Sequence, residues 1–247
     1  MNQQQIGQLK TIRNEITRFM MKYKFALDEI ETKIEILKEE FQALHDYSPI
    51  EHTKSRLKSL ESILKKLYRK GNDLSLESIE ENIKDIAGLR ITCSFLSDTY
   101  KVSEMLQKQS DLKVINVKDY IKNPKPNGYQ SLHLLVEVPV FLSDRVENVC
   151  VEVQIRTIAM DFWASLEHKI FYKYNQSVPE KLLLELKAAA DTANDLDHQM
   201  ERLQRDVQLI KDSHAEEALL EELRSFQMNN QQFKLPAGLI EVLKKDL

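Results

Sequence analysis

Apolar residues recur at steps of three and four along the first 44 residues, with few helix breakers between them. This spacing places them on one side of a helix, so it predicts two amphipathic helices, or one bent helix, ending near Leu44. Ser48 and Pro49 then resemble an N-cap followed by proline at the first helical position, and Gly71 follows Lys70. We therefore expect a further helix from Pro49 to Lys70.

The middle of the chain changes to short β-branched segments bounded by turn residues, which are typical of strands. Four such segments read GLRITCSF, LKVINV, SLHLLVEVPV and NVCVEVQIRT. Helical spacing returns from Asp98 to Gln109, between the first two segments, and from Ile158 to Tyr174, after the fourth. The pattern predicts an α+β core in which helices cover a mixed β-sheet.

A long polar helix is expected after Pro179, because apolar residues follow steps of four and three there. This heptad seam consists of Leu182, Leu186, Ala189, Ala193, Leu196, Met200, Leu203, Val207 and Ile210. Such a seam fits a contact between subunits and packing on the chain's own core equally well. The tail beyond Asp212 ends in a short amphipathic piece, Leu239 to Leu243, whose role the pattern does not indicate. We divide the chain into an N-terminal helical extension (1–47), a core (48–178) and a C-terminal helical extension with a tail (179–247).

Alternation is very regular in the segment VCVEVQIRT. Val151, Val153 and Ile155 fall on one face of the expected strand. Glu152, Gln154 and Arg156 fall on the other. Three long polar side chains on an interior strand are costly unless they line a wet or ligand-filled cleft, so we expect a cleft there. The alternative is an edge strand whose polar face lies in solvent.

The segment NVKDYIKNPKPNGYQ is expected to be a loop, because two prolines and Gly128 break any regular ladder. It is rich in cations and amides around one aromatic ring, Tyr129, and it leads into the strand that carries His133. Lysines at positions 118, 122 and 125 suit phosphate groups, and a flat ring suits a base or a guanidinium.

Two further features, a basic helix face and an acidic residue, indicate a functional site only if they lie in the same cleft. Lys58, Ser62, Lys66 and Arg69 or Lys70 recur on one side of the expected third helix, where a solvated lysine face is the ordinary explanation. Asp85 precedes a small-residue pair, Ala87-Gly88, and could simply cap a turn. Together with Glu152, however, Asp85 would form a pair of acids of the kind that holds Mg²⁺.

Composition narrows the class of protein. Of the 247 residues 30 % are charged, yet the net charge is −4, so no basic surplus indicates a general nucleic-acid coat, although nucleic-acid binding is possible. Cys93 and Cys150 lie inside strand-like runs, where reduced thiols are expected. No apolar run approaches the ~20 residues of a membrane span, and the amino terminus lacks the apolar core of a signal peptide. We expect a cytoplasmic protein with no membrane partner.

Four blocks in order, DIAGLRI, NGYQSLH, VEVQIRT and MDFWASLEHKI, resemble the synthetase domain of the RelA/SpoT family. The short chain with flanking helices is similar to the small alarmone synthetases, and the resemblance covers about Ser48 to Tyr174. It implies a nucleotidyltransferase-like core and transfer of the β,γ-pyrophosphate of ATP to the 3′-hydroxyl of GTP or GDP, in the stringent response. It also implies a tetramer. Such a transfer depends on alignment and charge neutralisation rather than on a protein nucleophile.

The resemblance also implies roles for individual residues. Arg56 and Arg90 would enclose the adenine, and the ATP phosphates would lie along Lys58, Ser62, Lys66 and Arg69. Asp85 and Glu152 would hold Mg²⁺, and Glu152 would take the proton of the attacking hydroxyl. Tyr129 would stack on guanine. The remaining acceptor residues would be Lys118, Lys125, Asn127, His133 and Gln154.

Some features depart from the family pattern. Only His45-Asp46 resembles the signature of the hydrolase domain in the long members, so we expect no hydrolysis. The segment after the last expected helix is too short for the regulatory domains of the long members, so we do not expect control through such domains. Gln130 stands where several small relatives have arginine, and Asp161 where some have asparagine, which leaves the preference between GTP and GDP open. The alternatives are a nucleotidyltransferase-like enzyme with another acceptor and a helical RNA-binding or scaffold module.

Overall fold

A mixed five-stranded sheet lies at the centre of the molecule in the computed structural model, which describes residues 3–45, 47–173, 179–213, 225–228 and 231–234. The strands are β1 (Ile50–Leu57), β2 (Ala87–Cys93), β3 (Lys113–Asp119), β4 (Leu132–Phe141) and β5 (Val146–Thr157). Their order is β1-β2-β5-β4-β3, with β2 and β5 parallel and the other pairs antiparallel. The predicted α+β class with a mixed sheet is confirmed.

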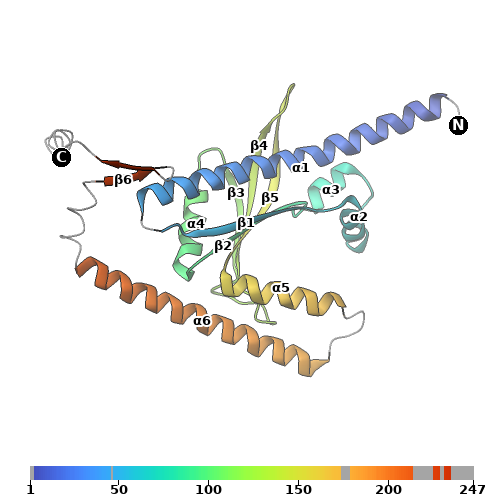
Figure 1. Ribbon diagram of the computed structural model, residues 1–247. Helices are drawn as coiled ribbons and strands as arrows, with labels where there is room; N and C mark the ends of the chain where they lie inside the picture. The colour runs from blue at the N-terminus through green and yellow to red at the C-terminus, as the bar shows by residue number, and fades with distance from the viewer. Residues whose placement is uncertain (1–2, 46, 174–178, 214–224, 229–230, 235–247) are drawn as a thin grey trace.

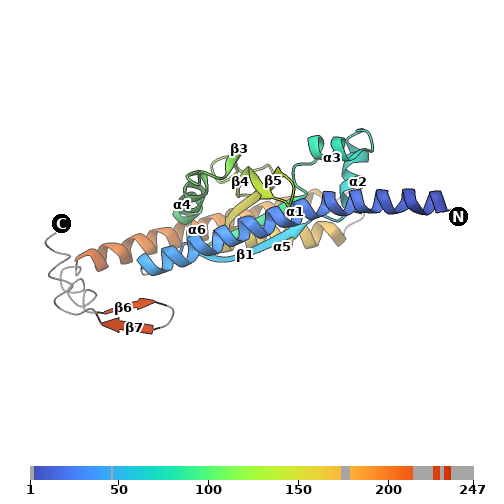
Figure 2. The same ribbon diagram turned by 90° about the horizontal axis from the view of Figure 1, so that it is seen from above.

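Helices cover the sheet on both sides (Figure 1). They are α1 (Gln3–Leu44), α2 (Leu60–Arg69), α3 (Leu76–Asn82), α4 (Leu96–Gln107), α5 (Ile158–Lys173) and α6 (Glu180–Ser213). Helices α1, α2 and α4 bury residues in the main core with the strands, whereas α5 and α6 meet in a second cluster around Trp163 and Ala190. Seen from above, α2 and α3 lie toward one end of the sheet and α4 toward the other (Figure 2). A separate hairpin joins β6 (Ser225–Met228) and β7 (Gln231–Lys234).

Residues 3–44 form one helix, α1, which was one of the two expected forms. Its buried residues include Tyr23, Ala26, Ile30 and Ile34, at the expected steps of three and four. The part before Phe19 is exposed and projects beyond the sheet (Figure 1). None of the helices in the described ranges is long and apolar enough to cross a membrane.

The predicted helix from Pro49 to Lys70 is wrong in its first half, because residues 50–57 form β1. Ser48 does not cap a helix. Its hydroxyl accepts a hydrogen bond from the Ile50 amide (3.2 Å) where the strand begins. Proline suits that position, since it lies just outside the ladder. The helix itself starts at Leu60, after the N-cap Ser59. β1 escaped prediction because an edge strand with one buried residue shows little apolar alternation.

Strand β5 lies between β2 and β4, so the alternative of an edge strand is wrong. Val151, Val153 and Ile155 are fully buried in the main core, as the alternation predicts. Ala87 and Gly88, interpreted from sequence as a turn, are the first residues of β2 instead. Apart from Ser213, β6 and β7, the tail beyond Asp212 lies outside the described residues, and so does its expected amphipathic piece from Leu239 to Leu243.

Candidate active site

The sheet register aligns polar side chains from all five strands on the face opposite the main core. One row across the sheet consists of Lys54, Arg90, Gln154, His133 and Lys118. The adjacent row includes Arg56, Gly88 and Glu152. Residues two apart on a strand share a face, so both rows contribute to one surface. Strand pairing thus brings together side chains that are far apart in the sequence.

Two cavities open on this surface, and Asp85 and Glu152 line both of them. The first, the Arg90 cavity, has a volume of about 500 Å³, and the second, the His133 cavity, about 350 Å³. The Arg90 cavity is also lined by Lys54, Arg56, Lys58, Gly88, Arg90, Tyr129, Gln154 and Arg156, with residues of α5. The His133 cavity is also lined by Lys66, Lys70, Lys118, Tyr120, Lys125 and His133. Each cavity therefore combines several cations with an aromatic ring.

Asp85 lies between two lysines at the junction of the cavities. The Lys58 and Lys66 amines both donate to its Oδ2 atom, at 2.6 and 2.7 Å. Burial would raise the pKa of Asp85, but these two lysines outweigh burial and lower it. The Oδ1 atom is buried and accepts no hydrogen bond from the described residues. One carboxylate oxygen is therefore charged, dehydrated and available to a cation.

Glu152 is the second acid, and both of its oxygens face donors. The Oε1 atom lies 3.4 Å from Nδ1 of His133, and Oε2 accepts a hydrogen bond from the Gln154 amide at 2.9 Å. The hydrogen bond from His133 lowers the pKa of Glu152, and Gln154 adds to this against the effects of burial and of Asp85. The side chain is consequently a carboxylate at neutral pH.

Tyr129 follows a tight turn in which the Gly128 amide donates to the Lys125 carbonyl at 2.8 Å. Gly128 has a φ of +87°, a conformation that favours glycine, and an added Cβ would lie 2.5 Å from the Ala190 Cβ of α6. Glycine is thus required because α6 supports the loop at this point. The Lys125 amine lies over the Tyr129 ring, 4.7 Å from its centroid, and is exposed to solvent. A base could displace this lysine without disturbing the core.

Most of the residues predicted for the site line one of the two cavities, but the division between them differs from the simple expectation. Tyr129 and Gln154, assigned to the acceptor side, line the Arg90 cavity. Ser62 and Arg69 line neither cavity, and the Ser62 hydroxyl bonds to Ser59 at the start of α2 instead. Asn127 also lines neither; its amide donates to Glu167 of α5 at 3.2 Å.

Several residues in and around the cavities had no role assigned from sequence, and three of them are Arg156, Asp161 and Tyr120. Arg156 was recognised only as part of the polar face, and Asp161 only as a family variation. Asp161 Oδ1 lies 2.9 Å from Arg90 Nη1 and 3.2 Å from Arg156 Nη1, so it joins two strands to α5. Tyr120, next to Tyr129 with ring centroids 6.1 Å apart, was also missed. The regular alternation in VEVQIRT could have identified Arg156, but nothing local identifies its partner.

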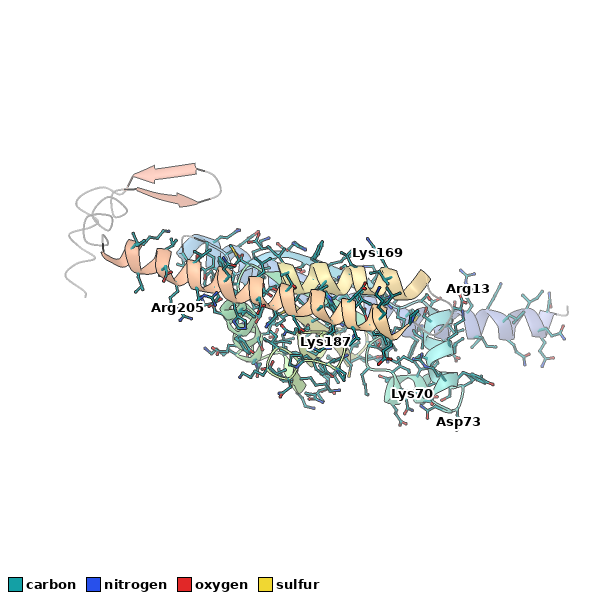
Figure 3. The ribbon with its side chains drawn as sticks, turned by 90° about the horizontal axis from the view of Figure 1, so that it is seen from below. Arg13, Lys70, Asp73, Lys169, Lys187 and Arg205 are labelled. Atoms are coloured by element: carbon teal, nitrogen blue, oxygen red, sulfur yellow. The ribbon has the colours of Figure 1, made fainter. Side chains whose placement is uncertain are left out.

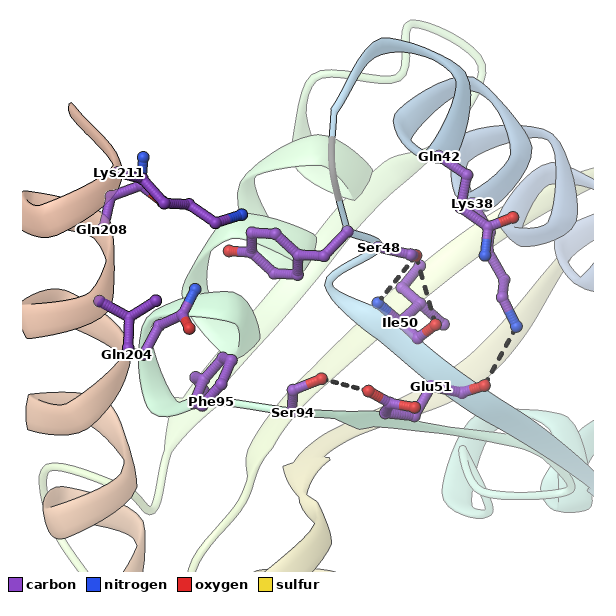
Figure 4. Close-up of a pocket in the computed structure, with 12 residues that line it drawn as sticks. Lys38, Gln42, Ser48, Ile50, Glu51, Ser94, Phe95, Gln204, Gln208 and Lys211 are labelled. Carbon is purple, nitrogen blue, oxygen red and sulfur yellow. Dashed lines mark hydrogen bonds between the residues drawn. The ribbon is translucent and has the colours of Figure 1, made fainter. Parts of the chain in front are cut away.

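Another cavity of about 500 Å³ lies between the end of α1, the start of β1 and the end of α6 (Figure 4). None of the predicted nucleotide-binding residues lines it. Its polar groups contact one another: the Lys38 amine donates to the Glu51 carbonyl at 3.0 Å, and the Ser94 hydroxyl bonds to the Glu51 carboxylate. It lacks the pair of acids that the two cavities on the polar face share.

Comparison with known proteins places these residues in a family. Residues 55–177 match the "Region found in RelA / SpoT proteins". The chain is 54 % identical over 199 residues to GTP pyrophosphokinase YwaC of Bacillus subtilis. The aligned residues cover 81 % of this chain and 95 % of the relative. The crystal structure of small alarmone synthetase 2 from B. subtilis matches with a TM-score of 0.71 and 54 % identity, over 77 % of this chain and 98 % of that one.

A second solved structure carries a bound molecule. Small alarmone synthetase 1 from B. subtilis, bound to its product pppGpp, matches with a TM-score of 0.73 and 40 % identity, over 78 % of this chain and 98 % of that one. The matched region includes β2, β4, β5 and α5, which contribute residues to the Arg90 and His133 cavities or lie against them. Sequence identity, near-complete coverage of the relatives and a shared fold agree: the chain belongs to the RelA/SpoT family.

Proposed function

We propose that the protein is a (p)ppGpp synthetase. It transfers the β,γ-pyrophosphate of ATP to the 3′-hydroxyl of GTP or GDP, giving pppGpp or ppGpp and AMP, in the stringent response. The observation that carries this proposal is the pair Asp85 and Glu152, two carboxylates shared by adjoining basic cavities. The names of the relatives and the pppGpp bound to small alarmone synthetase 1 support it.

The donor nucleotide occupies the Arg90 cavity in this proposal. Arg56 and Arg90 lie on neighbouring strands and enclose the adenine, since guanidinium groups stack on flat rings. Lys58 lines this cavity and Lys66 lines the adjoining His133 cavity; both bond to Asp85 and would neutralise the phosphates at the junction of the two. Ser62 and Arg69 lie on α2 beyond the cavity lining, so their contribution requires a phosphate chain that extends past Lys66.

The acceptor nucleotide occupies the His133 cavity, with Lys118 and Lys125 at its phosphates. Tyr129 lines the adjoining Arg90 cavity, and it offers its ring to guanine once Lys125 moves from the ring face toward a phosphate. Gln154 and His133 stand side by side on β5 and β4, and place the 3′-hydroxyl near Glu152. Asn127 acts indirectly, because its carbonyl oxygen accepts from the Tyr129 amide at 3.2 Å and fixes the turn.

The reaction needs one proton acceptor and no protein nucleophile. The 3′-oxygen bonds to the β-phosphorus of ATP, the bond from that phosphorus to the oxygen of the α-phosphate breaks, and AMP leaves. Glu152 takes the proton of the hydroxyl. Its low pKa makes it a weak base, so correct placement contributes more than basicity. Lysines around both cavities oppose the charge that accumulates on the phosphates.

The two acids fit Mg²⁺, a hard cation that prefers carboxylate oxygens and phosphates. The buried, unpartnered Oδ1 of Asp85 is the observation that favours a cation here, and Glu152 would be the second ligand. Mg²⁺ would lower the negative charge of the phosphates and ease deprotonation of a nearby hydroxyl. Within the described residues no group of three acidic, histidine or cysteine side chains is arranged so that it could hold a metal ion, so the phosphates would supply the other ligands.

We also propose that the chain assembles as a tetramer through its long helices. The heptad seam of α6 leaves Leu196, Leu203 and Val207 each half exposed, so much of it is not used within the chain. The projecting start of α1 likewise exposes Leu9 and Ile12. Large apolar side chains aligned along an exposed helix are typical of association between subunits. Figure 3 shows the charged side chains of Lys187 and Arg205 on α6.

The test is incubation of the protein with Mg²⁺, GDP or GTP, and ATP labelled in either its α- or its γ-phosphate. Chromatography should show γ-label in ppGpp or pppGpp and α-label in AMP. Incorporation of the α-label into the product would favour the nucleotidyltransferase-like alternative. Absence of any transfer would favour a scaffold or RNA-binding module, although two acids converging on one surface are not needed by such a module.

A further inference from the structure

Arg156 is a buried cation whose partners are unusual. Only 4 % of its surface is exposed, although it lies on the polar face of β5. Its Nη2 atom donates to the Tyr129 hydroxyl at 2.6 Å and to the Gln154 carbonyl oxygen at 2.8 Å. Its Nη1 atom donates to Asp161 at 3.2 Å. Burying a charge is unfavourable unless it is well paired, so the arrangement calls for a specific role.

The first consequence concerns the direction of the hydrogen bonds through Tyr129. A guanidinium only donates, so the Tyr129 oxygen accepts from Arg156 and its single proton points elsewhere. The next partner of that hydroxyl is Nε2 of His133, at 2.7 Å. Nε2 therefore accepts, and in neutral His133 the ring proton lies on Nδ1. Nδ1 faces Oε1 of Glu152, at 3.4 Å.

The second consequence concerns Gln154. Because Arg156 donates to one end of its amide, that end is the carbonyl oxygen and the other end is the NH₂ group. The NH₂ group lies 2.9 Å from Oε2 of Glu152. With the amide reversed, an NH₂ group would face the guanidinium and an oxygen would face the carboxylate, and both contacts would be repulsive. Arg156 thus fixes this orientation as well.

We propose that Arg156 is a positioning residue that directs one N–H group to each oxygen of Glu152, through Tyr129–His133 and through Gln154. Both series of side-chain contacts begin at Nη2 of Arg156 and end on the carboxylate of Glu152. They hold Glu152 ionised and in one rotamer while leaving Arg156 itself away from the reacting atoms. The proposal rests on the proposed function only for the catalytic meaning of Glu152; the direction of the two chains stands on geometry.

The direct test is the tautomer of His133 in the full-length protein, read from the ring nitrogens in a ¹⁵N NMR spectrum above neutral pH without nucleotides. A His133→Gln variant assigns the signals. We expect protonated Nδ1 and unprotonated Nε2 in the wild-type protein, and loss of this single tautomer in Arg156→Met. The control is Arg145→Met, which removes an arginine that pairs with Asp144 and Glu147 at the tip of the β4–β5 hairpin. It should leave the His133 signals unchanged.

Turnover provides the second readout. Misplacement of a reacting group by about 1 Å can cost on the order of 10²-fold in rate, so Arg156→Met should lower kcat by about that factor while Arg145→Met does not. An unchanged His133 tautomer in folded Arg156→Met would overturn the proposal. If that variant does not fold, the wild-type spectrum decides, because protonated Nε2 there would contradict the direction required by Arg156. If the wild-type protein shows no synthetase activity, the proposed function is rejected. The tautomer of His133 can still be measured in that case, so the two proposals fail separately.

Discussion

The two faces of β5 differ sharply in burial and polarity. Val151, Val153 and Ile155 have no exposed surface and pack among apolar side chains from α1 and the other strands. The alternating residue Glu152 lines both the Arg90 and the His133 cavity, and Gln154 lines the Arg90 cavity. Because side chains alternate along a strand, one strand stabilises the fold and carries the chemistry without either role constraining the other.

The separation ends where the strand ends. Arg156 and Thr157 are both buried, although they point to opposite faces, because α5 and α6 cover this end of β5. The Thr157 hydroxyl donates to Asp197 of α6 at 2.6 Å, which ties the strand to the C-terminal helix. Alternation therefore describes β5 only as far as the cavity extends, and a polar interior replaces it beyond.

The largest effects are expected when one residue on each face of β5 is changed, which tests whether the two faces have separate roles. Glu152→Gln keeps the size of the side chain but removes the base and a proposed metal ligand, so kcat should fall by about 10²- to 10⁴-fold or more while the fold is retained. Val153→Ala deletes buried methyl groups, and should lower the free energy of unfolding by roughly 2 kcal/mol while kcat is retained. Steady-state assays at saturating Mg²⁺ and thermal melts would measure both.

Glu137→Gln is the matched control, because Glu137 lies on β4 and pairs with Lys113 away from the two cavities. It should alter neither kcat nor Tm appreciably. Near-wild-type turnover of Glu152→Gln would reject the role assigned to this carboxylate. Loss of activity in folded Val153→Ala would show that the two faces are not independent.

How far the sequence alone predicts these features depends on how local each feature is. The faces of β5 could be predicted because alternation is a property of consecutive residues, and the loop at Gly128 because prolines and glycine interrupt any ladder. The strand β1 could not, since its pairing with β2 supplies the stability that its own pattern does not reveal. The register that places Lys54 opposite Arg90 is likewise a matter of tertiary pairing.

The partners of individual site residues were the least predictable part. Family resemblance indicated Asp85 and Glu152, and the structure brings both to one junction. The link from Arg156 to Asp161, however, depends on how α5 leaves the strand and turns back over it. The reason for glycine at position 128 is also distant, because it is the side chain of Ala190 on α6 that excludes a Cβ there.

The next largest effect concerns a ring that adjoins the polar face. Loss of base stacking costs on the order of 1–3 kcal/mol in nucleic-acid sites, so Tyr129→Ala should weaken GDP and GTP binding by about ten- to a hundredfold. Binding of ATP should remain nearly intact, and Tyr129→Phe, which keeps the ring, should retain most of the acceptor affinity. Calorimetry with each nucleotide separately measures this. Tyr129 lines the Arg90 cavity rather than the His133 cavity, so an ATP defect with normal GDP affinity would mean that the two nucleotides are assigned to the wrong cavities.

Assembly offers a comparison with the apolar face of β5, since the seam of α6 is apolar but exposed. Changing Leu196 and Leu203 together to glutamate should disrupt contacts between subunits and reduce the mass in solution about fourfold, from tetramer to monomer, without unfolding the core. Light scattering measures the mass and circular dichroism the fold. Arg205→Glu, on the same helix outside the seam, should not change the mass. An unchanged mass in the double variant would show that the seam does not mediate contacts between subunits and packs within its own chain.

Lys125 separates charge from stacking at the acceptor cavity. Lys125→Ala should weaken GDP binding several-fold at low salt, because it removes a cation near the proposed phosphates, and the difference from wild type should shrink as salt rises. The effect of Tyr129→Ala should persist at high salt. Lys122→Ala is the matched control, since that lysine lies over Tyr100 and pairs with Asp119 rather than lining the cavity. A salt-independent defect in Lys125→Ala would argue against a phosphate contact.

The smallest effect tests the end of β5, where alternation fails. Burial raises the pKa of Asp197 to about 6, and Glu201 adds to this against the hydrogen bond from Thr157 and the charge of His198. Between about pH 4 and pH 6 the folded protein therefore binds more protons than the unfolded chain, so this group makes stability fall as pH rises through that window. Asp197→Asn cannot ionise yet can still accept from Thr157. Its Tm should exceed that of the wild type by a few degrees at pH 7, with the difference vanishing toward pH 4. Asp195→Asn, an exposed change on the same helix, is the control and should show no such trend. A Tm difference for Asp197→Asn that does not vary with pH would mean that the buried carboxylate is not the group responsible.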